Sequence, residues 1–293
     1  MRINADMKTG LFLGLATLDL IYLAEKPPGE NQKVVAVDST IVAGGPATNA
    51  AVAFSCLGNA AVLAGVLGTG AIAQLIRADL GEYDIRIVDL QPGRSHSPPV
   101  SSIIVTEQTG DRAVISINAT KSQVDSQAIN PDILTSVNII LFDGHQIPAS
   151  QEIAELAQSK NIPIVLDGGS WKPGLAEILP FVKWAICSDN FHPPDCNNSE
   201  QVFAYLSAAG IPHIAITRGE KPIQYLRKGS FGSLEVPQIQ AADTSGAGDI
   251  FHGAFCHYIL QDNFKNALAA AAKIASDSCK TFGTRQWIKN IQT

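Results

Sequence analysis

The sequence predicts an α/β fold with a mostly parallel central sheet and helices on both of its faces, which makes three layers. Short runs of apolar residues alternate with segments of helical length along most of the chain. Such runs are typical of strands that are buried on both faces. The chain has 293 residues, of which 46% are hydrophobic and 16% are charged, so it can bury a large core.

The first half predicts part of this sheet together with a smaller one. Its elements are buried strands at 11–18 and 61–67, a half-exposed strand at 33–42, helices at 46–57 and 71–80, and a hairpin of 103–105 and 113–117. Asp19 directly follows the first strand, and Gly58 is a helix stop. Because the half-polar strands do not suit a sheet that is covered on both faces, we expect a small separate sheet, the lid, with strands from about 20–43 and 98–118.

The second half alternates strands and helices more regularly. The predicted elements are strands at 138–142, 163–167, 183–187 and 212–217, helices at 151–159 and 199–208, a hairpin of 222–227 and 231–235, and closing helices at 247–260 and 264–280. This order of elements predicts a single domain over residues 1–293.

Composition and charge narrow the function classes. The formal net charge is −6 and no dense Lys/Arg run occurs, which argues against nucleic acid or an anionic membrane as the partner. Glycines cut the uncharged stretch 39–76 into pieces that are too short to span a membrane. Five cysteines without Cys-x-x-Cys spacing, and an N-terminus without a signal-peptide pattern, predict a cytoplasmic protein with reduced thiols.

The segment from Asp243 to Phe255 carries the clearest chemical signal. A flexible turn, Gly246-Ala247-Gly248, lies directly ahead of an apolar helix, and Asp249 falls in the first turn of that helix. Backbone N–H groups at such a helix start bind anions, and a carboxylate beside the anion could take a proton from an attacking nucleophile. The segment therefore predicts phosphoryl transfer. An acid at this position also stabilises a helix by about 0.3–1 kcal/mol through the helix dipole alone.

A second glycine-rich turn precedes the helix that begins at Pro46. Gly44 and Gly45 allow close approach of the backbone to a ligand, and Asn49 offers both a donor and an acceptor to a hydroxyl group. Asp19 adds a carboxylate at the carboxyl edge of the sheet, where α/β proteins bind ligands. Taken alone, each feature also has a plain structural explanation: a turn with an exposed Asn, and a solvated turn Asp.

Together the two glycine-rich segments resemble the signatures of the ribokinase-like (PfkB) family of carbohydrate kinases. Residues 243–251 match every fixed position of the pattern Asp-Thr-x-Gly-Ala-Gly-Asp-x-Phe, and residues 44–51 match Gly-Gly-x-x-x-Asn-x-Ala. The resemblance covers essentially the whole chain and implies the ribokinase-like three-layer sandwich with a small β lid. It also implies that Asp249 is the catalytic base and that the anion hole consists of Gly246, Ala247 and Gly248.

The same resemblance assigns the other sites. It implies a sugar site formed by Asp19, Gly44, Gly45 and Asn49, and a nucleotide side with Thr217, Gly219 and Gly283. The last glycine alone would also suit a helix C-cap. ATP and Mg²⁺ are the implied cofactors, with Asp243 beside a monovalent cation such as K⁺.

One departure from the family pattern concerns the metal. Many members carry an Asn-x-x-Glu motif that organises Mg²⁺, whereas this chain has Ser188-Asp189-Asn190-Phe191 at that place. Asp189 is therefore the candidate to hold Mg²⁺ through water. The opening segment up to Asp19 and the Trp171-Lys172-Pro173 region look loosely closest to ketohexokinase-like sugar kinases.

The resulting expectation is an ATP-dependent carbohydrate kinase that takes a sugar and ATP as partners and forms a homodimer through the lid, because an exposed sheet has edges to protect. Two alternatives stay open: a nucleoside kinase of the same family, and a sugar- or nucleotide-sensing protein that kept the fold and lost turnover. The helix dipole favours the ionised form of Asp249, so we expect a weak base that acts mainly by orienting the hydroxyl.

Overall fold

The structure is a computed structural model that describes residues 7–124 and 129–291. A large sheet contains nine strands in the order β13-β12-β11-β10-β9-β8-β1-β4-β5. The seven strands from β11 to β5 are parallel, and β12 and β13 continue the sheet in antiparallel pairing. The strands of this sheet are β1 (Thr9–Leu13), β4 (Ala60–Gly65), β5 (Arg86–Asp89), β8 (Ile139–Phe142), β9 (Ile164–Gly168), β10 (Val182–Ser188), β11 (His213–Arg218), β12 (Lys221–Arg227) and β13 (Ser230–Leu234).

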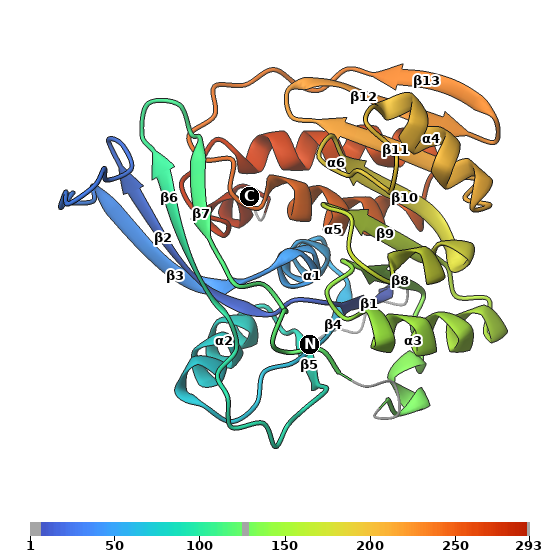
Figure 1. The fold of residues 1–293 in the computed structure, drawn as a ribbon, viewed down its shortest axis with the longest axis horizontal. Helices are drawn as coiled ribbons and strands as arrows, with labels where there is room; N and C mark the ends of the chain where they lie inside the picture. Colours follow the sequence, from blue (N-terminus) through green and yellow to red (C-terminus); the bar gives the residue numbers. More distant parts are fainter. Residues whose placement is uncertain (1–6, 125–128, 292–293) are drawn as a thin grey trace.

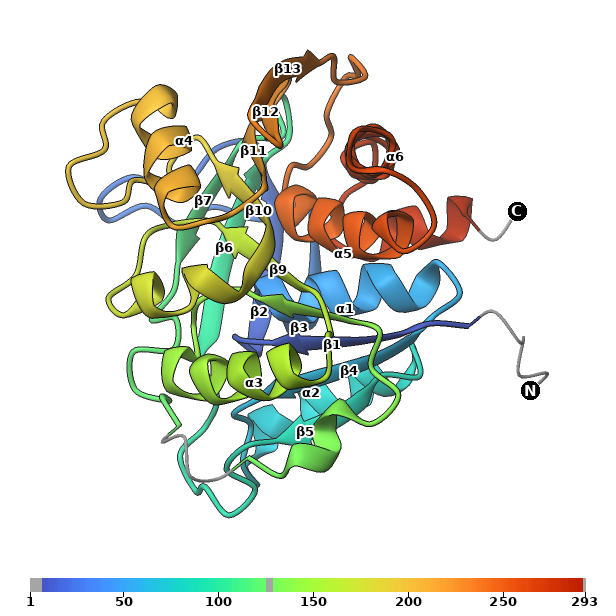
Figure 2. The ribbon, with the colours of Figure 1, turned by 90° about the vertical axis from the view of Figure 1, so that its right-hand side faces the viewer.

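Helices cover both faces of this sheet, as Figure 2 shows. One layer contains α1 (Pro46–Cys56), α2 (Ala71–Gly81), α5 (Ala247–Ile259) and α6 (Phe264–Ser278), and the other contains α3 (Ile147–Ser159) and α4 (Ser199–Ala208). Short 3₁₀ helices lie at Pro131–Leu134, Leu175–Glu177, Leu179–Phe181 and Gln286–Asn290. Within β1, Phe12 belongs to one core, whereas Leu11 and Leu13 belong to the core on the opposite face. The predicted three-layer arrangement is thus confirmed.

A second sheet, the lid, stands beside the main sheet (Figure 1). Its four strands are β2 (Thr17–Ala24), β3 (Asp38–Gly44), β6 (Val100–Thr106) and β7 (Arg112–Ile115), in the order β3-β2-β6-β7. The central pair, β2 and β6, is parallel, and the two outer pairs are antiparallel. One face of the lid buries a small apolar cluster that consists of Ile21, Val42, Ile103 and Val105.

The predicted strand 11–18 is wrong, because two strands of different sheets share this apolar run. β1 ends at Leu13, and β2 begins at Thr17 and belongs to the lid. The chain turns at Gly14, where a Cβ atom would lie 2.0 Å from the Asp143 carboxylate. Asp19 is consequently the third residue of a lid strand and does not end a strand of the main sheet. The four-residue strand β5 was also missed, since its residues are polar or only partly buried.

No helix within residues 7–124 and 129–291 is long and apolar enough to cross a membrane. The uncharged stretch 39–76 is instead divided among β3, α1, β4 and the beginning of α2.

Close packing of α1 against α5 controls the geometry of the two glycine-rich segments. A Cβ atom on Gly253 would lie 2.2 Å from the backbone carbonyl oxygen of Ala50. The two helix backbones therefore touch at this glycine. α1 begins at Pro46 and α5 at Ala247, each within two turns of this contact, so the contact holds the first turns of the two helices next to each other.

We predict that Gly253→Ala lowers the free energy of unfolding by about 1–3 kcal/mol, since the added methyl group must push α1 and α5 apart. Denaturant titration measures the change. The matched control is Gly81→Ala at the end of α2, where an added Cβ atom meets nothing within 4 Å. That control is expected to leave stability unchanged or to raise it slightly. Equal effects of the two substitutions would contradict the close helix contact.

Candidate active site

The carboxyl ends of the parallel strands bring polar residues to one edge of the main sheet. Asp143 directly follows β8, Asp167 is the fourth residue of β9, and Thr217 lies near the end of β11. Parallel strands all end at the same edge, which is the usual ligand-binding edge in α/β folds. The first turns of α1 and α5 reach this edge from one face of the sheet.

The predicted anion hole lies at the beginning of α5. Gly246 is the N-cap residue and has φ +69°, a left-handed conformation that favours glycine. The first hydrogen bond of the helix runs from the Ile250 N–H to the Gly246 carbonyl, at 2.8 Å. A Cβ atom on Gly248 would meet nothing within 4 Å, so the side of this residue where a side chain would lie is open. The Ala247 N–H donates to the Thr244 carbonyl in a long bond of 3.4 Å.

Asp249 and Asn49 meet across the α1–α5 contact. The Asn49 Nδ2 atom donates to Asp249 Oδ2 at 2.8 Å, although the two residues are 200 positions apart. Burial, and after it the nearby Asp167 carboxylate, raise the pKa of Asp249 to about 6 against the opposing effects of Asn49, Arg112 and His252. The expectation of a weak base was wrong, because burial and Asp167 outweigh the helix dipole.

Asp19 is a buried carboxylate with an unused oxygen. The residue is 5% exposed, and its Oδ1 atom has no hydrogen-bond partner among the described residues. Burial raises the pKa of Asp19 to about 6, against the opposing effects of the Ser101 hydroxyl and the Arg285 guanidinium. A buried acceptor without a donor is costly in a folded protein, which points to a ligand hydroxyl as its partner.

Neighbouring protein atoms already require glycine at positions 44 and 45. A Cβ atom on Gly44 would lie 1.9 Å from Asp19 Oδ2, and one on Gly45 would lie 2.4 Å from the Leu15 carbonyl oxygen. Gly45 also has φ +99°, which side chains rarely adopt. Gly44 thus leaves room for the Asp19 carboxylate and Gly45 for the turn after β1, and their place beside the acceptor stays a prediction.

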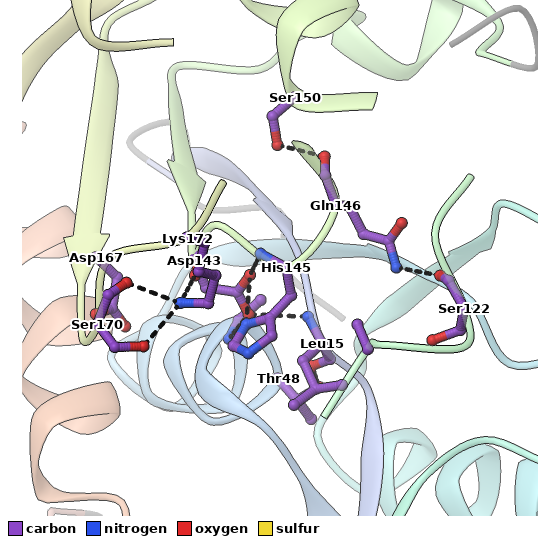
Figure 3. A network of polar contacts seen from close by, with 12 residues as sticks. Leu15, Thr48, Ser122, Asp143, His145, Gln146, Ser150, Asp167, Ser170 and Lys172 are labelled. Carbon is purple, nitrogen blue, oxygen red and sulfur yellow. Dashed lines mark hydrogen bonds and ion pairs between the residues drawn. The ribbon is translucent and has the colours of Figure 1, made fainter. Parts of the chain in front are cut away.

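Asp143 is the centre of the polar network in Figure 3. Its Oδ2 atom accepts from the backbone N–H groups of Leu15, at 2.8 Å, and Ala47, at 3.2 Å, and its Oδ1 atom accepts from the His145 N–H at 2.9 Å. Burial alone would raise the pKa of Asp143, but His145, the Leu15 N–H and Lys172 outweigh burial and lower it to about 2. This permanently charged carboxylate joins the turn after β1, the start of α1 and the loop after β8.

Two of the predicted nucleotide-side residues, Gly283 and Thr217, are hydrogen-bonded to the predicted metal residues Asp243 and Asp189. Asp243 accepts from the Gly283 N–H at 2.8 Å and from the Ser245 N–H at 2.7 Å, so it ties the segment before α5 to the segment after α6. The Thr217 carbonyl accepts from the Asp189 N–H at 3.0 Å. Gly219 lies in the tight turn between β11 and β12, with φ +62°.

The predicted Mg²⁺ residue, Asp189, lies apart from Asp243. It lines a polar cavity of about 440 Å³ together with Asn190, Asn197 and Asn198, between β10 and the beginning of α4. The residues that the structure describes contain no group of three or more His, Cys, Asp or Glu side chains arranged to hold a metal ion. Any Mg²⁺ here would consequently depend largely on phosphate and water ligands.

The lid reaches the anion cradle through the turn between β6 and β7. The Gly110 carbonyl accepts from the Thr244 N–H at 3.2 Å and from the Thr244 hydroxyl at 3.0 Å. Arg112 donates to the Thr244 carbonyl. The lid thus covers the segment that leads into Gly246.

A family model described as pfkB family carbohydrate kinase matches residues 7–290. The chain belongs to this family. The predictions of a PfkB-family protein and of a carbohydrate kinase are therefore confirmed, whereas the roles of individual residues remain predictions.

Several relatives of this carbohydrate kinase are ribokinases. The ribokinase of Bacillus subtilis (strain 168) is 25% identical over 288 residues, which cover 95% of each chain. A protein from Agrobacterium tumefaciens assigned as a ribokinase has a TM-score of 0.82 at 22% identity and covers 98% of this chain and 99% of its own. The Arabidopsis thaliana ribokinase solved with ribose and ATP has a TM-score of 0.75 at 19% identity, with the same coverage.

The likeness to ketohexokinase is weaker than the sequence suggested. The ketohexokinase of Mus musculus is 25% identical over 162 residues, only 54% of either chain. The ribokinase match covers nearly the whole kinase chain instead.

Sequence reasoning missed four charged residues of this site. Asp143 and Asp167 stand at the carboxyl ends of apolar strands, a signal that was applied only to Asp19. Arg112 and Arg285 reach the site from the lid and from the C-terminal segment, and no local pattern marks either residue. His252 is 5% exposed, and its Nδ1 atom lies 3.5 Å from Asp167 Oδ2.

We predict that Gly44→Ala raises the KM for the acceptor at least tenfold, about the effect of losing one hydrogen bond to a charged group, because the methyl group displaces the Asp19 carboxylate. The KM for ATP should change little. Initial-rate kinetics with each substrate varied in turn measures both constants. Gly93→Ala is the control, since its Cβ atom meets nothing within 4 Å. An unchanged acceptor KM in Gly44→Ala would exclude Asp19 from the acceptor site.

Proposed function

We propose that this PfkB-family kinase transfers the γ-phosphoryl group of ATP to a hydroxyl group of a sugar or sugar derivative, with Asp249 as catalytic base and an anion hole of Gly246, Ala247 and Gly248. The observation that carries this proposal is the placement of the Asp249 carboxylate. It lies in the first turn of α5, next to the Gly246–Gly248 segment, and is bonded to Asn49. A base, an anion cradle and an acceptor-side amide therefore adjoin one another.

The chemistry is a single displacement. The acceptor oxygen forms a bond to the γ-phosphorus while the bond from that phosphorus to the β–γ bridging oxygen breaks, and ADP leaves. The hydroxyl proton passes to Asp249. With a pKa of about 6, this carboxylate is mostly ionised at pH 7 and still accepts a proton more readily than an ordinary Asp. The N–H groups of the cradle bind the charged phosphoryl oxygens.

The acceptor site would lie between Asp19, Gly44, Gly45 and Asn49. The unpaired Oδ1 atom of Asp19 can accept a hydrogen bond from a sugar hydroxyl. Asn49 has a second amide proton beside the one that it donates to Asp249. The ribose bound by the Arabidopsis relative supports a sugar acceptor.

The nucleotide would lie along the C-terminal half, near Thr217, Gly219 and Gly283. The Arabidopsis ribokinase, which was solved with ATP, supports this nucleotide. The contact of the lid with Thr244 would exclude water from the phosphoryl group and so limit hydrolysis of ATP.

Mg²⁺ would neutralise the phosphate charge when it is bound. Asp189 would hold it through water, and its position in a polar cavity fits a hydrated ion. Asp243 would lie beside a monovalent cation such as K⁺. Each of its carboxylate oxygens accepts one backbone N–H and keeps a second lone pair for such an ion.

We infer a cytoplasmic location from the cysteines. All five are free in the structure, and four of them are buried. Oxidising compartments favour disulfides, which this chain does not form.

The test is a coupled assay of ADP formation with ATP, Mg²⁺ and a panel of pentoses, ketoses, sugar acids and nucleosides. Acceptor-dependent ADP formation with a sugar supports the proposal. Turnover of nucleosides alone would identify a nucleoside kinase. Tight binding of a sugar or nucleotide without turnover would identify a sensing protein.

We predict that Asp249→Asn lowers kcat by roughly 10²–10⁴-fold, the usual contribution of a general base, while the Kd for ATP stays nearly constant. Steady-state kinetics and isothermal titration calorimetry give the two values. Asn preserves the size of the side chain and its bond to Asn49, so it isolates the loss of the base. A comparable loss of turnover and of nucleotide affinity would exclude Asp249 as the base.

We also propose that the kinase forms a homodimer through the lid. The lid face opposite its apolar cluster exposes Tyr22, Ile41 and Ile115, and Ile115 is 78% exposed. Exposed strand edges and apolar side chains of this kind are typical of surfaces that pair with another sheet.

We predict that Ile115→Asp converts the dimer into a monomer, because a carboxylate in the centre of an apolar interface lacks a partner. Light scattering after size-exclusion chromatography measures the mass. Phe231→Asp on β13 is the control, since Phe231 is 69% exposed on the main sheet, away from the lid. A monomeric wild-type protein, or an Ile115→Asp protein that remains dimeric, would contradict this interface.

A further inference from the structure

Arg285 lies among the acceptor-site residues, although the proposed reaction assigns it no role. It comes from the segment after α6, and its side chain is 10% exposed. Its Nη1 atom donates to Asn49 Oδ1 at 2.9 Å, and its Nη2 atom donates to the Ala43 carbonyl at 2.5 Å. The residue therefore contacts both the first turn of α1 and the end of the lid strand β3.

Arg285 and Asp249 select the same orientation of the Asn49 amide from its two sides. An arginine side chain can only donate hydrogen bonds, so the amide atom that faces it must be the oxygen. The Nδ2 atom then faces Asp249, to which it donates at 2.8 Å. Without Arg285, the amide oxygen would lose its donor and the amide would be free to swing about its one remaining bond, which would weaken its contact with Asp249.

The guanidinium group is itself held firmly. Asp79 of α2 lies 3.4 Å from Arg285 Nη2, and the same Asp79 oxygen accepts from the Ala43 N–H at 3.0 Å. The ring of Tyr83 lies 5.6 Å from the guanidinium carbon. Both backbone groups of Ala43 are thus bonded to the Arg285–Asp79 pair, directly before Gly44. This arrangement leaves Arg285 little freedom to release Asn49.

We propose that Arg285 is a positioning residue of the phosphoryl-transfer site: it fixes the Asn49 amide so that one N–H donates to Asp249 and the other faces the acceptor hydroxyl. The inference rests on the role of Asp249 proposed above. It gives the C-terminal segment a direct part in aligning the base with the acceptor.

The substitution that tests this proposal is Arg285→Met, which keeps the bulk of the side chain and removes its donors. The Asn49 N–H lowers the pKa of Asp249, so its loss should raise that pKa further above the wild-type value of about 6. A shift of about one unit corresponds to a tenfold change in proton affinity. A base must be ionised to act, so the loss of kcat/KM should be larger at pH 6 than at pH 8.

The decisive readout needs no turnover. Carbon-13 NMR of protein labelled at aspartate follows the titration of the Asp249 carboxyl group, which the spectrum of Asp249→Asn assigns. The charged groups that act on Asp249 are Asp167 of β9, Arg112 of β7 and His252 of its own helix, α5. Arg285→Met changes none of these three groups but removes the charge of Arg285, so an Asn49→Ala background separates the loss of that charge from the loss of the Asn49 contact.

Arg77→Met is the matched control. Arg77 likewise donates to a backbone carbonyl, that of Gly68, and to a carboxylate, that of Asp89 at 2.6 Å, but not to the site. We expect this control to leave the Asp249 titration unchanged. In an Asn49→Ala background, Arg285→Met should produce no further shift, because the amide that links the two residues is absent.

Two results would overturn the proposal: a wild-type titration of Asp249 in Arg285→Met, or an undiminished shift in the Asn49→Ala background. Should Arg285→Met fail to fold, Arg285→Lys serves in its place and is expected to shift the titration in the same direction by a smaller amount. If Arg285→Met shifts the Asp249 titration while no acceptor of the panel is turned over, the linkage through Asn49 stands and the kinase proposal fails.

Discussion

The hydrogen bond between Asn49 and Asp249 joins the beginnings of two helices, and the rest of the site is arranged around it. It forms only because α1 and α5 touch at Gly253, where no side chain separates the backbones. Asp143, directly after β8, fixes the start of α1 by accepting a hydrogen bond from the Ala47 N–H. One close helix contact therefore brings the acceptor-side amide to the carboxylate that stands beside the anion cradle.

The carboxylates around this contact divide into two kinds. Asp143 accepts three backbone N–H groups and keeps a pKa of about 2, so it serves as a permanent structural anion. Asp19 and Asp249 are desolvated with fewer donors, and both have a pKa of about 6. Carboxylates that are poised near neutral pH in a ligand-binding region are candidates for acceptor binding and proton transfer, whereas a fully bonded one is part of the scaffold.

The sequence predicted the fold and the two glycine-rich segments because both depend on local patterns. Apolar runs indicated the parallel strands, and Gly246 through Asp249 indicated the start of a helix. Asp19 was assigned to the wrong sheet, since the apolar run of 11–18 conceals the turn at Gly14 that Asp143 stabilises. Arg285 could not be found in this way: its partners, Asn49 and Ala43, are 236 and 242 positions away and become neighbours only in the folded chain. The pKa of Asp249 was misjudged for the same reason, because its largest cause is burial in the folded chain, followed by Asp167 on a distant strand.

The most direct measurement is a crystal structure of the kinase with a non-hydrolysable ATP analogue, Mg²⁺ and the sugar that the panel turns over fastest. The account predicts one sugar hydroxyl within about 2.6–3.2 Å of the Asp249 carboxylate, in line with the γ-phosphorus, with the phosphoryl oxygens on the N–H groups of Gly246–Gly248. A sugar hydroxyl that is directed away from Asp249, or a γ-phosphate bound elsewhere than at the start of α5, would contradict it.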